Sequence, residues 1–131
     1  MSHRVLVVDD DRSVRTSTAR ALELEGYEVE VAVDGLQGLD TLASAGAELI
    51  VLDVMMPKRS GFEVLEQIKK NSQYKDVPVV MLSNLAGKED ADRAIQMGAA
   101  EYLIKSQYQP KEIVEKVVEI IRTRAAQAPS A

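Results

Sequence analysis

The feature that most constrains this chain is a reactive polar residue directly after each of four short apolar runs. The runs are residues 5–8, 49–52, 79–82 and 102–104, and the residues that follow them are Asp9, Asp53, Ser83 and Lys105. Short apolar runs of this kind predict β-strands. Because the carboxyl ends of parallel strands share one edge of a sheet, beside which ligands bind, we expect these four side chains to lie close together.

Segments with a helical spacing of apolar residues alternate with the strand-like runs, which is typical of βαβ units and a parallel sheet. Residues 28–33 alternate as Glu-Val-Glu-Val-Ala-Val and predict an edge strand with one side toward water. The runs at 5–8, 49–52 and 79–82 are continuously apolar and predict interior strands. With right-handed crossovers, the pattern predicts an α/β fold: a flavodoxin-like doubly wound (βα)5 three-layer sandwich with parallel strand order 2-1-3-4-5.

Several residues mark the ends of the expected helices. Asp11 and Asp34 are candidate N-caps, Ser60 with Glu63 fits a capping box, and Pro110 suits the first turn of the last helix. The fourth helix, at about residues 88–97, draws its apolar residues mostly from Ala. We therefore expect it to pack less firmly than the other helices.

Length and composition narrow the functional classes. The chain of 131 residues predicts a single domain over residues 1–124, with a flexible tail or linker stub at 125–131. The absence of Cys excludes disulfides and thiolate metal sites. A net charge of −5 argues against direct nucleic-acid binding, and no apolar stretch is long enough for a signal peptide or a membrane span. We expect a cytoplasmic protein without membrane contact.

The predicted sheet edge concentrates negative charge. Asp9, Asp10 and Asp53 would repel one another by about 4 kcal/mol per pair at roughly 4 Å and an effective dielectric constant near 20. Lys105 supplies one compensating charge, and a divalent cation would supply two more. Mg²⁺ is the natural candidate, because it prefers carboxylates, water and phosphate oxygens. Asp53 lies alone at the centre of the group, so we expect it to act as the nucleophile that forms an aspartyl phosphate, with the Ser83 hydroxyl donating to a phosphoryl oxygen.

Four segments carry a resemblance to a known family. They are Val-Leu-Val-Val-Asp-Asp at 5–10, Leu-Asp-Val-Met-Met-Pro at 52–57 with Gly61, Met-Leu-Ser at 81–83, and Gly-Ala-Ala-Glu-Tyr-Leu-Ile-Lys at 98–105. In this order and spacing, the chain resembles the receiver domain of two-component response regulators over about residues 5–122.

The resemblance implies how the acids work together. Asp53 would accept a phosphoryl group from the phosphohistidine of a histidine kinase or a phosphotransfer protein. Asp9, Asp10, Asp53 and the backbone carbonyl of Met55 would hold Mg²⁺ or Mn²⁺. Lys105 matches the family's ion-pairing lysine. On this reading the chain is a phosphoacceptor that assists its own phosphorylation and dephosphorylation, and not a turnover enzyme.

The resemblance also implies a switch. Ser83 matches the hydroxyl residue that follows the phosphoryl group, and Tyr102 matches the aromatic residue that turns inward when that hydroxyl moves. The output surface would be the fourth helix, fifth strand and fifth helix. It would act on a downstream protein target that the sequence does not identify, as a monomer or a phosphorylation-dependent dimer.

Two positions depart from the family pattern. Ser106 follows Lys105 where the family usually has proline, often after a cis bond. A cis bond before a non-proline residue costs about 2.5–4 kcal/mol, so we expect a trans bond and an altered loop before Pro110. Asn84 follows Ser83 where a small residue is usual, and its bulk is expected to narrow access to Asp53.

Three alternatives are open. A receiver-fold binding module could act without phosphorylation, a reading that Ser106 and Asn84 leave possible. An aspartyl-phosphate phosphohydrolase resembles Asp-x-Asp after a strand, but Asp53 is followed by Val54 and Met55. A flavin carrier would need a hydroxyl- and glycine-rich loop after the first strand, where this chain is acidic.

Overall fold

The structure, a computed structural model, describes residues 3–56, 60–84 and 87–127, with only the backbone described at 125–127. Its five strands are Arg4–Val8 (β1), Glu28–Ala32 (β2), Leu49–Asp53 (β3), Val79–Ser83 (β4) and Glu101–Ile104 (β5). They form one parallel sheet in the order β2-β1-β3-β4-β5, as the sequence predicts.

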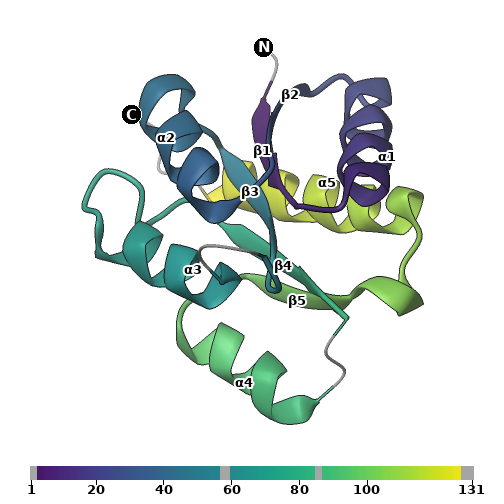
Figure 1. Ribbon diagram of the computed structural model, residues 1–131. Coiled ribbons are helices and arrows are strands. Elements are labelled where there is room, and N and C mark those ends of the chain that lie inside the picture. The colour runs from purple at the N-terminus through teal and green to yellow at the C-terminus, as the bar shows by residue number, and fades with distance from the viewer. Residues whose placement is uncertain (1–2, 57–59, 85–86, 128–131) are drawn as a thin grey trace.

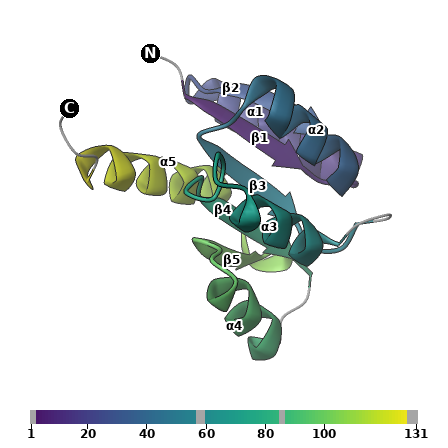
Figure 2. The same cartoon turned by 90° about the vertical axis from the view of Figure 1, so that its left-hand side faces the viewer.

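The helices cover both faces of this sheet. They are Arg12–Leu24 (α1), Gly35–Ala45 (α2), Gly61–Lys70 (α3), Lys88–Gln96 (α4) and Pro110–Gln127 (α5), with a 3₁₀ turn at Lys105–Gln107 (η1). Helices α1 and α5 lie on one face of the sheet, and α2, α3 and α4 lie on the other (Figures 1 and 2). The predicted three-layer α/β sandwich is therefore confirmed. Helix α5 continues through Gln127, beyond the expected start of the tail at residue 125.

The predicted caps fix where three of the helices begin. The Asp11 carboxylate accepts hydrogen bonds from the backbone N–H groups of Ser13 and Val14, and Asp34 accepts one from Gln37 N–H. The Ser60 hydroxyl oxygen accepts from Glu63 N–H at 3.3 Å. Each cap satisfies a backbone donor that would otherwise lack a partner in the first turn.

Alternate residues of the interior strands supply two separate hydrophobic cores. Leu6, Ile50 and Met81 face α2, α3 and α4, whereas Val7 and Val51 face α1 and α5. This is the expected result for a parallel sheet with helices on both faces. The edge strand β2 differs, since Val31 remains 46% exposed.

Helix α4 packs lightly, as the sequence predicts, because Ala94 is the one fully buried side chain that it contributes. Its Arg93 guanidinium lies 4.2 Å from the centre of the Phe62 ring of α3, a cation–π contact. The Lys105–Ser106 peptide bond is trans, as expected, and it lies within η1. Over the described ranges, no helix combines the length and the apolar character that a bilayer crossing needs.

Candidate functional site

Strand register brings the predicted site residues to one edge of the sheet. Asp53 is the last residue of β3 and pairs with Leu82 of β4, so Ser83 is the next residue along the neighbouring strand. Asp9 directly follows β1, where its N–H donates to Ala32 of β2. Lys105 directly follows β5.

Lys105 bridges two buried carboxylates. Its Nζ lies 3.0 Å from Asp9 Oδ2 and 3.1 Å from Asp53 Oδ1. The Asp9 and Asp53 side chains are 1% and 4% exposed, and the Lys105 side chain is 14% exposed. The second Asp9 oxygen accepts from Asp11 N–H at 2.9 Å, which fixes the orientation of that carboxylate. An ammonium group is thus held between two acids that have little solvent to screen their charges.

Burial and charge shift the pKa of both central groups. Burial raises the pKa of Asp53 to about 7, with the negative charge of Asp9 adding to the rise and Lys105 opposing it. Burial alone would lower the pKa of Lys105, but its hydrogen bond to Asp9 and the charges of Asp53 and Asp9 outweigh burial and raise it. The ammonium group of Lys105 therefore stays charged, and its single positive charge is shared between Asp9 and Asp53.

The three acids form a group that suits a hard cation. One oxygen from each of Asp9, Asp10 and Asp53 lies within 4.8 Å of the others. Asp10 is exposed, so a cation could keep water ligands on that side. Carboxylates with water are the ligands that Mg²⁺ prefers, and Lys105 brings a single positive charge to the two acids that it contacts. The donor set therefore fits Mg²⁺ or Mn²⁺.

The remaining predicted residues lie near this centre but differ in their surroundings. Ser83 is fully buried at the end of β4, and Asn84 beside it is exposed. Met55 is 59% exposed in the loop after β3, and its N–H donates to Asp53 Oδ1 at 3.3 Å. Tyr102 is half-buried in β5, two strand positions before the edge residue Ile104, and packs against the core under α2, α3 and α4.

Two further residues contact the backbone of the site residues. A Cβ atom on Gly61 would lie 2.3 Å from the backbone oxygen of Asp53, so only glycine lets the start of α3 approach β3 this closely. Gly61 N–H donates to Val54 O at 2.7 Å. Arg15, which the sequence pattern did not indicate, donates to the backbone oxygen of Asp9 at 2.9 Å. An arginine in the second turn of a helix carries no local signal of such a contact.

Comparison with other proteins identifies the family of this chain. The family model for the response regulator receiver domain matches residues 5–118. The response regulator MprA of Mycobacterium tuberculosis H37Rv is 43% identical over 105 residues, which are 80% of this chain and 45% of that protein. The probable transcriptional regulator ycf27 of Cyanidium caldarium is 36% identical over 120 residues, 92% of this chain and 47% of that protein. The chain thus spans a little under half the length of these relatives.

Solved structures agree with the sequence comparisons. A CheY-like receiver domain protein of Methanospirillum hungatei JF-1 superposes with a TM-score of 0.89 at 30% identity, covering 98% of this chain and 100% of that one. The chemotaxis response regulator CheY4 of Vibrio cholerae gives a TM-score of 0.85 at 32% identity, over 92% and 99% of the two chains. The chain belongs to the response regulator receiver domain family of two-component signalling.

Proposed function

We propose that this chain is a phosphorylation-activated switch whose phosphoacceptor is Asp53. The observation that carries the proposal is the contact of Lys105 Nζ with both Asp53 and Asp9, beside the exposed Asp10. This arrangement supplies one buried nucleophile, one fixed cation and an open acidic position for a divalent metal. The donor would be the phosphohistidine of a histidine kinase or a phosphotransfer protein, and the compartment the cytoplasm.

The transfer exchanges one phosphorus bond for another. An Asp53 carboxylate oxygen attacks the phosphorus atom, the P–O bond forms, and the P–N bond to the donor imidazole breaks as that ring takes up a proton. Mg²⁺, held by Asp9, Asp10, Asp53 and the Met55 carbonyl, would neutralise negative charge on the phosphoryl oxygens. The Lys105 ammonium group would stabilise the charge of one phosphoryl oxygen, and the Ser83 hydroxyl would donate a hydrogen bond to a different one. In dephosphorylation, a water oxygen attacks the phosphorus atom and loses its proton to solvent, the P–O bond to Asp53 breaks, and inorganic phosphate leaves.

The same chain would transmit the change to a partner. A phosphoryl group adds about −1.5 to −2 charge at neutral pH, next to Ser83 and Lys105. Ser83 pairs with Ile104 of β5, two positions after Tyr102, and η1 continues directly from β5. Helix α4 has few buried contacts to hold it. We therefore propose that phosphorylation alters the surface of α4, β5 and α5, with Tyr102 turning inward, and so changes affinity for a downstream protein.

The acceptor is tested by adding a small-molecule phosphodonor with Mg²⁺ and measuring intact mass over time. One phosphoryl adduct is expected, and it should disappear in Asp53→Asn. The matched control is Asp40→Asn, since Asp40 is an exposed acid of α2 away from the site. No adduct, or an adduct that survives Asp53→Asn, would contradict the proposal. It would favour the receiver-fold binding module that works without phosphorylation.

The switch is tested by hydrogen exchange with and without the phosphodonor. Exchange in α4 and β5 should change in the parent chain and stay constant in Asp53→Asn. An unchanged α4 in a fully phosphorylated sample would contradict the output surface but not the acceptor.

The role of Asn84 is tested by following the intact mass of the phosphorylated protein over time. Asn84→Ala should shorten the lifetime of the adduct, because the smaller side chain opens access for water.

A further inference from the structure

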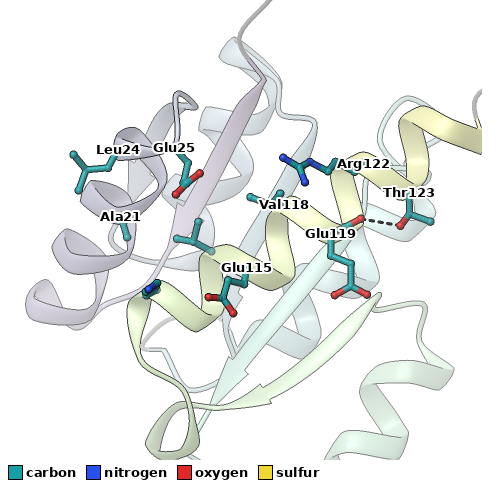
Figure 3. A pocket seen from close by; sticks show the side chains of 10 residues that line it. Ala21, Leu24, Glu25, Glu115, Val118, Glu119, Arg122 and Thr123 are labelled. Carbon is teal, nitrogen blue, oxygen red and sulfur yellow. Dashed lines mark hydrogen bonds between the residues drawn. The ribbon is translucent and has the colours of Figure 1, made fainter.

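A groove separate from the acidic site runs between α1 and α5. Its volume is about 740 Å³, and it extends along α5 from Lys111 to Thr123 beside the last turn of α1. Figure 3 shows Val118 pointing from α5 toward α1, between the two helices. Ala21 and Val118 are half-buried parts of the core beneath this groove. The floor is thus apolar and continuous with the interior of the protein.

The rim combines an exposed apolar side chain with charges of both signs. Leu24 is 79% exposed, the highest value among the exposed large apolar residues that the structure describes. Glu115 and Arg122 lie on the same side of α5, two turns apart. Within the described part of the chain, neither of these two side chains takes part in an ion pair. Leu24 lines the same groove as Ala21 and Val118, so the apolar floor continues to an exposed apolar side chain at the rim.

Two charges of the groove, Glu115 and Arg122, can pair across a two-fold axis, and a third, Glu119, lies beside that axis. Glu115 precedes Val118 by three residues, and Arg122 follows it by four. If two α5 helices pack antiparallel about a two-fold axis between Val118 and Glu119, each Arg122 lies level with Glu115 of the other copy. The contact is then made twice by symmetry, as an isologous interface requires. The same arrangement covers Val118 and the floor of the groove in both copies.

We propose that the occupant of this groove is a second copy of this chain, so that the protein forms a two-fold dimer through α1 and α5 without phosphorylation. Charge complementarity within one surface favours this occupant over an unrelated helix, whose charges would need to match by chance. The interface is limited to one helix pair and its flanks, which places it among weak and transient associations. It leaves α4 and the acidic site free.

The test is sedimentation velocity on the unphosphorylated chain over a concentration series, with no phosphodonor present. We expect a dimer with a dissociation constant between about 1 µM and about 1 mM. Arg122→Glu and Glu115→Arg should each weaken it by about tenfold or more, because like charges then oppose each other twice. Arg20→Glu is the matched control, since Arg20 is exposed on α1 outside the groove. Circular dichroism checks that each variant is folded.

Rescue distinguishes this dimer from a nonspecific effect of charge. An equimolar mixture of the Arg122→Glu and Glu115→Arg variants restores opposite charges at both contacts, and so does the double variant. Both samples should recover the parent affinity. A chain that stays monomeric at every concentration, a dimer that ignores the single reversals, or a mixture that fails to recover would each overturn the proposal.

Discussion

The ammonium group of Lys105 lies 3.1 Å from the carboxylate of Asp53, although Lys105 follows β5 and Asp53 ends β3, and β4 lies between these two strands. The same Nζ lies 3.0 Å from Asp9, beyond β3. One flexible side chain therefore spans the edge of the sheet and joins both buried acids. Three predictions depend on this arrangement, and a fourth concerns the backbone that supports Asp53.

Removing the ammonium group should destabilise the metal-free protein. In Lys105→Met, Asp9 and Asp53 keep their burial but lose their shared positive partner, and we expect a loss of about 2–3 kcal/mol in the free energy of unfolding at neutral pH. Urea denaturation measures it. Lys116→Met is the matched control, because its contact with Glu101 is 3.6 Å long and both side chains are over a third exposed. That change should cost under about 1 kcal/mol, and an equal loss in both variants would contradict the prediction.

Mg²⁺ should stabilise the folded chain. Binding to the folded state alone adds about 1.4 kcal/mol when free Mg²⁺ is about ten times its dissociation constant. Asp10→Asn should weaken this effect, because it removes the exposed acid of the group. Asp11→Asn serves as the control, since Asn caps a helix about as well as Asp. Thermal unfolding across a Mg²⁺ titration compares the two, and equal losses of Mg²⁺ response would argue against a metal site at Asp10.

The metal-free protein should lose stability through Asp53 as the pH rises. The folded chain keeps a proton on Asp53 up to a pKa of about 7, whereas the ordinary value is 3.8. Between these two values the folded state binds more protons than the unfolded state, so raising the pH from about 4 to about 7 disfavours folding. The penalty is absent below the lower value and complete above the higher one.

Comparison with Asp53→Asn isolates this contribution from those of the other acids. With a chelator present, the variant should gain stability relative to the parent chain as the pH rises through this window. The difference should shrink in saturating Mg²⁺, because the cation compensates the ionised carboxylate. A parent-minus-variant difference that stays constant with pH would show that Asp53 has an ordinary pKa.

Gly61→Ala should damage the support of the site. The added Cβ would lie 2.3 Å from the Asp53 backbone oxygen and 2.7 Å from Val54 Cα, and backbone cannot move aside as a side chain can. We expect a loss of about 1–3 kcal/mol and slower adduct formation at Asp53. Gly38→Ala is the graded control, because its Cβ would meet a Val8 methyl group at 2.9 Å, which can shift. A milder effect at Gly61 than at Gly38 would contradict this reading.

The sequence by itself determined the elements of the fold and which residues end the strands. Asp11, Asp34 and Ser60 act within three residues of their own positions, so their caps follow from local chemistry. The alternation of Glu and Val in β2, against the continuous apolar runs elsewhere, was enough to place it at the edge of the sheet. Periodicity and strand order were thus enough to predict that the acids lie at a common edge of the sheet.

Only the tertiary structure decided the contacts that give those residues their properties. Strand order does not fix the distance between side chains on different strands. The bridge from Lys105 to Asp9 therefore depends on the twist of the sheet, and the rise in the pKa of Asp53 depends on burial. The groove beside Val118 depends on how α1 and α5, distant in sequence, pack across one face of the sheet. Helical periodicity shows which side of each helix is buried, but the relative position of two helices is settled by close packing of all their neighbours.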